Sequence, residues 1–323
     1  MNKTNTGTKK YRYLLKWIFW VLLAQLVLIN ISAALYAYKL THFYEGAPRH
    51  ASSKNIFKKT WKLFVGPKFY KNTAEPEPPF PIRTISLKTD NDILIDAWYS
   101  TMDSSRTCII FFHGITVNKS YYISEAAMMR QMGYNVMLVD LRAHGRSGGN
   151  SSTFGMKETD EVQKAYNWAL ANGNDRIILY GGSLGAAICI KAVAEKKVQP
   201  AAIIADMPFG SLHHHLVAKA SNLGFPSEPF ATLVTMWMGF EKGFNGFDHD
   251  VSDYARKVNC PALIQWGEED SYVNRKEVMG VYQNLASPMK KFVSYPHADH
   301  ESLLKIDPDE WQYQIQTFIN SLP

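Results

Sequence analysis

Residues 181–185 have types and spacing suited to nucleophilic chemistry. They read Gly-Gly-Ser-Leu-Gly, a G-x-S-x-G pattern centred on Ser183, with an apolar run before them and a helical pattern starting at Leu184. A serine on so tight a strand-to-helix turn is held in strained backbone, and Gly181 and Gly185 let neighbouring backbone approach closely. The turn would raise the hydroxyl above the carboxyl edge of a sheet, at the N-terminus of the following helix. Ser183 is therefore predicted to be a nucleophile, with a plain glycine-rich turn as the alternative.

A serine hydroxyl needs a base within hydrogen-bond reach and a third group that orients this base. Two later segments offer such groups at the ends of predicted strands. Glu268, Glu269 and Asp270 follow one strand, and His297 and His300 follow the last one. The chain order is serine, acid, histidine, and the residue types alone leave open which acid and which histidine take part.

The elements that must bring these side chains together alternate between strands and helices from residue 82 onward. Two strands, 82–88 and 93–100, flank the hairpin turn signal Asp90-Asn91-Asp92. Apolar strands that are separated by helices indicate a mostly parallel sheet covered on both faces. We therefore expect an α/β fold with eight strands, the first two antiparallel. The other strands are predicted at 108–112, 135–140, 177–180, 201–205, 261–266 and 290–295, and helices at 120–132, 158–171, 184–195, 275–285 and 308–320.

Residues 207–255 interrupt this alternation. The segment is rich in His, Phe, Met and Trp, and we predict a small helical cap over the catalytic edge. The run His213, His214 and His215 suggests a metal cluster, but adjacent residues of one helix point in different directions. A solvated or cap-packing face is the preferred interpretation, so no metal site is predicted.

The N-terminus has the pattern of a membrane anchor. Residues 1–16 carry five cations and no acidic residue, and residues 17–38 carry no formal charge. Such a segment spans about 30 Å as a helix, and aromatic residues lie at both of its ends, as in interfacial belts. We predict a transmembrane helix over 17–38, with a cleavable signal peptide or a buried core helix as alternatives. The cation bias predicts a cytoplasmic N-terminus and an extracytoplasmic catalytic domain.

Residues 39–81 are predicted to connect the anchor to the catalytic domain, 82–323. Mixed basic and aromatic residues over 45–70 suit an amphipathic helix, which either lies on the membrane or docks on the domain. The stretch 75–81 contains four prolines and is expected to be a stiff, extended spacer.

Composition excludes several other classes of protein. Hydrophobic residues make up 46% of the 323 residues and charged residues 20%, which is typical of a globular protein. The net charge of +6 comes with basic residues crowded into the N-terminal third, so no nucleic-acid partner is expected. Cys108, Cys189 and Cys260 have neither disulfide nor zinc spacing and are predicted to be small buried hydrophobes. No metal or organic cofactor is implied.

Four segments with distinctive patterns follow four of the predicted strands. They are His-Gly-Ile-Thr-Val-Asn at 113–118, Asp-Leu-Arg-Ala-His-Gly-Arg-Ser at 140–147, the turn at 181–185, and Gly-Glu-Glu-Asp-Ser-Tyr-Val at 267–273. In this order they resemble the HGxxxN oxyanion loop, the DxRGxGxS loop, the nucleophile elbow and the GxxDxxV acid loop of α/β-hydrolases. Ala143 and His144 depart from the simpler glycine spacing of the second. The resemblance covers residue 82 to the end and is to the branch of esterases, monoacylglycerol-lipase-like and serine aminopeptidase-like proteins.

This resemblance implies roles for individual residues. Ser183 would attack the acyl carbon, His300 would take its proton and return it to the leaving group, and Asp270 would accept the other imidazole N–H. The family spacing and the trailing Val273 favour Asp270 over the two glutamates. A position just before the final helix favours His300 over His297.

The same resemblance implies an oxyanion hole. The backbone N–H groups of Ile115 and Leu184 are expected to form it. His144 is expected to tie its own loop together. Four more residues are expected to support the geometry: His113, which would brace the oxyanion loop, and Gly114, Gly181 and Gly185.

The function that follows is a membrane-anchored serine hydrolase that cleaves a carboxylic ester, lipid-like or thioester substrates included, through an acyl-enzyme. A serine peptidase or aminopeptidase of the same fold is one alternative. It would need a carboxylate pair in the cap, for which Glu228 and Glu241 are candidates, besides Asp248, Asp250 and Asp253. A membrane-bound scaffold without activity is the other alternative. The sequence predicts no particular oligomeric state.

Overall fold

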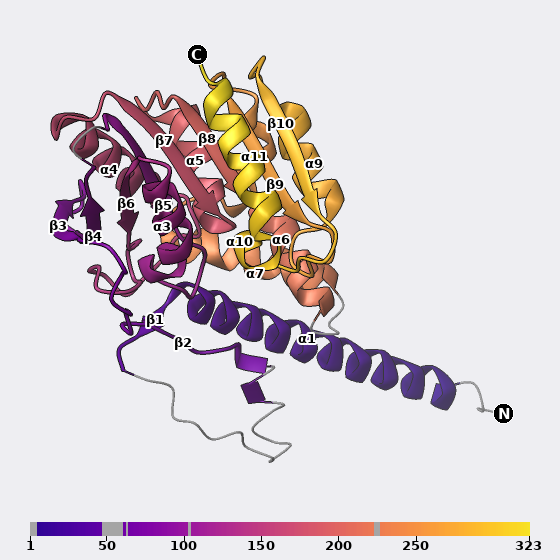
Figure 1. Ribbon diagram of the computed structural model, residues 1–323. Helices are drawn as coiled ribbons and strands as arrows, with labels where there is room; N and C mark the ends of the chain where they lie inside the picture. The colour runs from indigo at the N-terminus through magenta and orange to yellow at the C-terminus, as the bar shows by residue number, and fades with distance from the viewer. Residues whose placement is uncertain (1–4, 47–60, 63, 103–104, 223–226) are drawn as a thin grey trace.

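An eight-stranded sheet forms the centre of the molecule (Figure 1). The computed structural model describes residues 5–46, 61–62, 64–102, 105–222 and 227–323. The strands lie side by side in the order β10-β9-β8-β7-β5-β6-β4-β3. Their bounds are β3 Arg83–Lys88, β4 Leu94–Ser100, β5 Thr107–Phe112, β6 Asn135–Val139, β7 Arg176–Gly182, β8 Ala202–Asp206, β9 Ala262–Gly267 and β10 Lys290–Tyr295.

The strand directions confirm the predicted mostly parallel sheet. All neighbours from β10 to β6 pair in parallel. Strand β4 is antiparallel to both β3 and β6, so β4 is the strand that runs against the others. Because the remaining strands share one direction, their carboxyl ends meet at one edge of the sheet, where ligands of such sheets bind.

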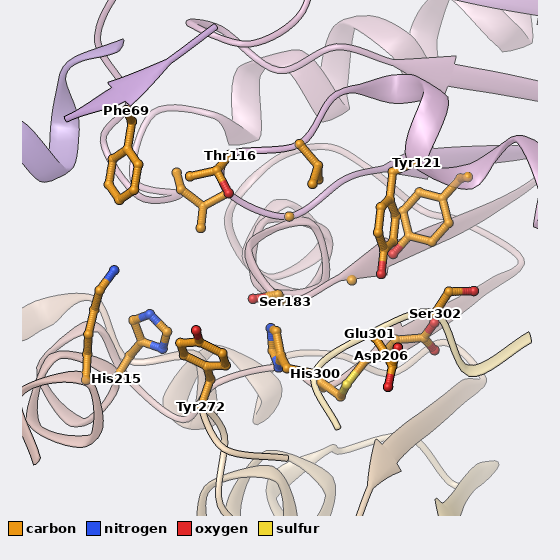
Figure 2. A pocket seen from close by; sticks show the side chains of 17 residues that line it. Phe69, Thr116, Tyr121, Ser183, Asp206, His215, Tyr272, His300, Glu301 and Ser302 are labelled. Atoms are coloured by element: carbon orange, nitrogen blue, oxygen red, sulfur yellow. The ribbon is translucent and has the colours of Figure 1, made fainter. Parts of the chain in front are cut away.

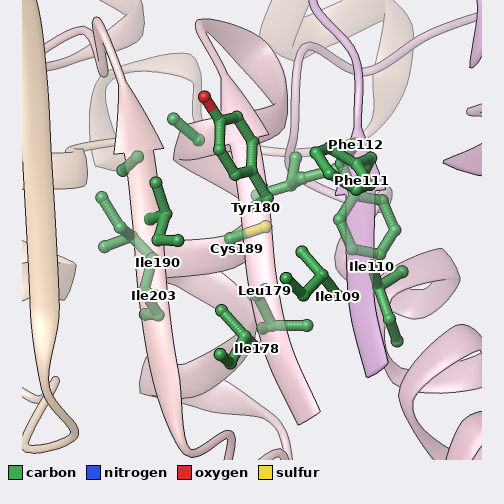
Figure 3. Packing of buried hydrophobic residues seen from close by; sticks show 14 of the residues in the cluster. Ile109, Ile110, Phe111, Phe112, Ile178, Leu179, Tyr180, Cys189, Ile190 and Ile203 are labelled. Atoms are coloured by element: carbon green, nitrogen blue, oxygen red, sulfur yellow. The ribbon is translucent and has the colours of Figure 1, made fainter. Parts of the chain in front are cut away.

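The core explains why the central strands are apolar throughout. Strands β5 and β7 are buried on both faces, so they lack the alternation of a half-exposed strand. Figure 3 shows side chains 109–112 of β5 and 178–180 of β7, together with Cys189 of the following helix, which belongs to the same apolar cluster. Each such buried side chain contributes about 1.5–3 kcal/mol of transfer free energy. All three cysteines are free, Cys260 being only partly buried.

Helices cover both faces of the sheet. Helices α4 (Thr159–Ala171), α5 (Leu184–Glu195), α8 (Val251–Ala255) and α9 (Arg275–Asn284) contact one another in series along one face. The other face carries α3 (Ile123–Gln131), α10 (Leu303–Ile306) and α11 (Pro308–Ser321), with the short helix η1 (Lys119–Tyr122) before α3 (Figure 1).

Local capping fixes where the last two long helices begin. The side chain of Asn274 accepts the backbone N–H of Glu277 at the start of α9, and that of Asp307 accepts the N–H of Glu310 at the start of α11. Such caps contribute about 1 kcal/mol each. Pro308 follows at the first position of α11, where its missing N–H costs nothing.

The predicted insertion at 207–255 contains helices α6 (Leu212–Asn222) and α7 (Ser227–Lys242), the short helix η2 (Gly246–Asp248) and α8. Helix α7 packs on α6 through an apolar cluster separate from the sheet's core. The sequence places this insertion between β8 and β9, at the edge that carries the carboxyl ends of the parallel strands.

The N-terminal helix α1 (Asn5–Thr41) projects from the body (Figure 1). Its part Lys10–Thr41 is long and apolar enough to cross a membrane, judged by length and composition. From Lys10 to Ile31 the residues are mostly exposed. Beyond them, Ala33, Tyr36, Ala37 and Leu40 are buried and pack into the apolar cluster of the cap.

The connection between α1 and the sheet is partly described. Strand β1 (Phe43–Tyr44) pairs in parallel with β2 (Phe69–Tyr70). The amphipathic helix considered for 45–70 falls largely on residues 47–60 and 63, outside the described residues. Further on, the side chain of Asn118 donates to the carbonyls of Asn72 and Ala74, which attaches the chain just before the spacer to the body.

Candidate active site

Ser183 lies at the junction of β7 and α5 in backbone that few non-glycine residues adopt. Its φ is 52° and its ψ is −111°, and such a conformation costs about 1–3 kcal/mol. The surrounding sheet holds it there, since the Ser183 N–H donates to the carbonyl of Asp206 at the end of β8, at 2.8 Å. Ser183 thus lies directly after the carboxyl end of β7, where the elbow pattern places the nucleophile.

The glycines around Ser183 are required by close backbone contacts. A Cβ on Gly185 would lie 1.8 Å from the carbonyl oxygen of Phe112, and one on Gly181 would lie 2.3 Å from the backbone of Gly185. A Cβ on Gly182 would lie 2.0 Å from the hydroxyl of Tyr122. Real Cβ atoms do not approach so closely, so these positions accept only glycine without rearrangement.

His300 and Asp270 are hydrogen-bonded to each other. The Nδ1 atom of His300 lies 2.8 Å from Oδ2 of Asp270, whose side chain is fully buried. The other oxygen, Oδ1, accepts the backbone N–H groups of Tyr272 and Val273, both at 2.8 Å. The carboxylate therefore has fixed partners on both oxygens, and it can hold the imidazole with its Nε2 atom turned away from the acid.

The neighbouring acids and histidine make other contacts. Glu268 accepts a hydrogen bond from the hydroxyl of Ser294, and Glu269 lies 3.7 Å from Nδ1 of the exposed His297. Asp299 accepts the backbone N–H groups of Ser271 and His300. These bonds lower the pKa of Asp299 and join the acid loop to the histidine loop.

Ser183 and His300 border the same cavity of about 310 Å³. Figure 2 shows the ring of His300 next to Ser183, with Phe69 and His215 to one side and Tyr121 and Asp206 to the other. Apolar atoms of Ile115, Val117 and Met207 also line this space. The structure thus brings the predicted serine, histidine and acid to one place from three separate loops.

The predicted oxyanion residues border this cavity as well. Gly114 is so close that an added Cβ would lie 3.5 Å from Cβ of Ser183, and Ile115 follows it along the cavity wall. Leu184 opens helix α5, where the first N–H groups have no acceptor within the helix. Its N–H and that of Ile115 come from the two loops that meet at the serine.

Two buried histidines brace the loops behind the cavity. In His113, Nδ1 donates to the carbonyl of Gly114 at 2.7 Å, and Nε2 accepts the N–H of Leu141 at 3.1 Å. In His144, Nδ1 donates to the carbonyl of Arg142, and Nε2 accepts the N–H of Thr116. Burial lowers the pKa of His113 to about 4 and that of His144 to about 3, so both rings are neutral.

The three consecutive histidines of α6 have three different environments. His213 contacts Glu228 and Thr235 within the cap, at 3.0 and 3.2 Å. His214 is exposed, whereas His215 is 7% exposed and lines the cavity. Because their surroundings differ, the three histidines do not form one metal site. The preferred interpretation of a solvated or cap-packing face did not anticipate that His215 lines the cavity.

A group of three carboxylates elsewhere is held by a lysine. Glu75, Asp96 and Asp140 lie close enough together to suggest a cation site. The ammonium of Lys119 lies among them, 2.7 Å from Asp96 and from Asp140 and in contact with Glu75. This buried network connects the spacer to the loop after β5, which carries Gly114 and Ile115.

Sequence reasoning missed Asp206 and Lys219, which also line the cavity. Asp206 accepts hydrogen bonds from the Tyr180 hydroxyl and the Gln265 amide, and burial raises its pKa to about 7. Its position at the carboxyl end of an apolar strand could have marked Asp206 as a candidate site residue. Lys219 lies four residues after His215 on α6, and nothing in its local sequence indicates a cavity.

Comparison with known proteins agrees with the fold. Residues 103–239 match the family described as "Serine aminopeptidase, S33". A solved esterase structure from Pyrococcus furiosus superposes with a TM-score of 0.64, at 23% identity, over 78% of this chain and 99% of the esterase.

Two curated relatives match at the sequence level. The lysophosphatidylserine lipase ABHD12 of Xenopus tropicalis is 25% identical over 61% of this chain and 52% of the lipase. The protein bem46 of Schizosaccharomyces pombe is 24% identical over 67% of this chain and 70% of that protein. The chain thus spans about half the length of the lipase it matches. The chain thus has the α/β-hydrolase fold, and its middle part is similar to the serine aminopeptidase family.

Proposed function

We propose that this chain is a membrane-anchored hydrolase of carboxylic esters, with Ser183 as nucleophile, His300 as base and Asp270 as the residue that orients the base. The observation that carries the proposal is the His300–Asp270 hydrogen bond of 2.8 Å, with His300 lining the same cavity as a serine in strained elbow backbone. Relatives that are named as esterases and lipases support the ester class.

The reaction follows from these positions. The Ser183 oxygen attacks the ester carbonyl carbon while Nε2 of His300 takes the hydroxyl proton. The N–H groups of Ile115 and Leu184 stabilise the negative oxygen of the tetrahedral intermediate, where one donor contributes about 3–4 kcal/mol. His300 then gives the proton to the leaving alcohol. A water molecule, deprotonated by His300, cleaves the acyl-enzyme and releases the acid.

The cap supports an ester rather than a substrate with a free amine. The carboxylates considered for amine binding, Glu228 and Glu241, are not among the described residues that line the cavity. Glu228 instead contacts His213 and Thr232 within the cap. The cation of Lys219 on the cavity lining would repel an ammonium group. Of the two carboxylates on the same lining, Asp206 is engaged by Tyr180 and Gln265, and Glu301 is exposed.

The N-terminal helix supports a lipid-like ester. Helix α1 packs on the cap that covers the site, so an anchored chain would hold the cavity near a membrane surface. We propose a single-pass orientation with the N-terminus in the cytoplasm, on the basis of the five cations before the apolar segment.

Covalent labelling tests the proposal. The full chain, purified in detergent, should react with a fluorophosphonate probe and hydrolyse p-nitrophenyl esters, and Ser183→Ala should lose both. Ser294→Ala is the matched control, since its hydroxyl bonds Glu268 outside the cavity. Labelling that persists in Ser183→Ala would contradict the nucleophile. An unlabelled wild type would favour an inactive scaffold, and faster cleavage of aminoacyl-naphthylamides than of esters would favour an aminopeptidase.

A further inference from the structure

The cavity is lined by one lysine, Lys219. Lys219 lines it together with Ser183, and its ammonium lies 5.5 Å from the centroid of the Phe69 ring. Among the residues that the structure describes, no carboxylate forms an ion pair with it. Burial lowers the pKa of Lys219 to about 8, and no acid raises it again. Lys219 is only partly exposed, and an ammonium group that loses hydration is costly unless an anion or strong acceptors compensate for the loss.

A histidine with an unpaired nitrogen among the described residues lies one helical turn away. His215 precedes Lys219 by four residues on α6, so both side chains share one face of the helix. His215 is 7% exposed, and its Nδ1 atom has no hydrogen-bond partner among the described residues. Figure 2 shows this histidine at the cavity, on the same side of Ser183 as Phe69. Burial lowers the pKa of His215 to about 3, so the ring is neutral and can donate one N–H.

The two acids that line the cavity do not meet this need. Asp206 is engaged by Tyr180 and Gln265, and it lies on the other side of Ser183 in Figure 2. Glu301 is exposed and adjacent to His300 in the chain. A ligand with its own negative charge would satisfy both Lys219 and His215, and a neutral ligand would leave the ammonium desolvated and unpaired.

We propose that Lys219 and His215 form a subsite for an anionic group, a carboxylate or a phosphate, of an ester whose carbonyl is attacked by Ser183. This inference rests on the proposed function and narrows its substrate class to esters that carry a negative charge near the scissile bond. The charged group lies on the His215 side of Ser183, and the apolar part of the substrate takes the remaining space.

Two pairs of substrates test the subsite. The first pair, p-nitrophenyl butyrate and mono-p-nitrophenyl glutarate, differs by a carboxylate on the acyl side. The second pair, 1-oleoylglycerol and 1-oleoylglycerol 3-phosphate, differs by a phosphate on the alcohol side. Lys219→Met should lower the anionic-to-neutral ratio of kcat/KM about 30-fold in at least one pair, mainly through KM, as expected for a charge-assisted contact. Lys219→Arg should recover much of the ratio, and His215→Phe should lower it less.

Lys276→Met is the matched control, because Lys276 is exposed on α9 and does not line the cavity; its ratio should equal that of the wild type. An unchanged ratio in Lys219→Met for both pairs would overturn the subsite, while the fluorophosphonate reaction of Ser183 would still stand for the proposed function.

A binding measurement tests the subsite without turnover. Monododecyl phosphate should raise the Tm of Ser183→Ala more than dodecanol does, and adding Lys219→Met should abolish this difference. Equal shifts by the two amphiphiles would again overturn the subsite.

Discussion

Replacing Asp270 by asparagine isolates the role of the acid. Asparagine keeps a carbonyl oxygen where Oδ1 accepts the N–H groups of Tyr272 and Val273, so the loop can keep its shape. Where Oδ2 lies 2.8 Å from Nδ1 of His300, the variant presents an amide N–H instead. Nδ1 must then become the acceptor, which places the imidazole proton on Nε2. That nitrogen could no longer take the proton of Ser183.

The loss of charge adds a second effect that can be worked out from the geometry. A hydrogen bond of 2.8 Å places the centres of the two delocalised charges about 4 Å apart, which at an effective dielectric constant of about 20 gives about 332/(20 × 4), or about 4 kcal/mol. This stabilisation acts on the imidazolium that forms in the transition state. Its removal corresponds to about a 10³-fold lower rate, and the wrong tautomer lowers the rate further.

We therefore expect Asp270→Asn to lower kcat for p-nitrophenyl esters at least about 10³-fold, with little change in KM or Tm. Glu269→Gln is the matched control, since its carboxylate lies one residue away and faces the exposed His297; it should retain wild-type activity. Asp270→Asn with activity within tenfold of the wild type would refute the reasoning. Asp206→Asn should then be assayed, because Asp206 is the buried carboxylate that borders the same cavity.

Two further predictions concern packing and pH. Gly182→Ala would place a Cβ 2.0 Å from the Tyr122 hydroxyl, so it should lower the free energy of unfolding, measured in urea, by about 1–3 kcal/mol. Adding Tyr122→Phe removes that hydroxyl and should recover part of the lost stability. A double variant no more stable than Gly182→Ala would contradict this contact as the cause. The buried rings of His113, His144, His215 and His249 have pKa values of about 4, 3, 3 and 4, below that of an unfolded histidine, so the unfolded chain binds protons first as the pH falls. Lowering the pH from 7.5 to 5.5 should therefore reduce the free energy of unfolding by about 1.4 kcal/mol for each of these rings. Asp206 and Glu161, whose pKa values are raised to about 7, bind protons in the folded state and offset about 2 kcal/mol each. The net result is a loss of about 1–2 kcal/mol, and a urea midpoint that stays constant or rises would refute this.

The strands and the elbow were predictable because their signals are local. Strands β5 and β7 are apolar over their whole length since both faces are buried, and the glycines around Ser183 follow from contacts within one turn. The mostly parallel order of the sheet then followed from the helices between its strands. The apolar strands, the glycine turn and the alternation of strands with helices can each be recognised without knowing how distant segments pack.

The lining of the cavity was not predictable in the same way. The spacing of His215 and Lys219 places both on one face of α6, but what that face meets depends on how the cap packs over the sheet edge. Likewise, the apolar run 17–38 suggested one uniform span, yet Ala33, Tyr36 and Ala37 serve as core residues of the cap. The lining of the cavity and the burial of the end of α1 both depend on contacts between segments that are distant in sequence. A single sequence contains no local pattern that indicates such contacts.

The packing of α1 has a mechanical consequence. Its last turns pack into the apolar cluster of the cap, so a shortened chain that begins after residue 40 would expose an apolar surface on α6 and α7. A soluble version should therefore keep the helix from Ser32 onward. If α1 spans a membrane, an outward movement of the cap must either move α1 with it or break the contacts between α1 and the cap. The thickness and stiffness of the surrounding bilayer would then set part of the resistance that the cap meets when it moves.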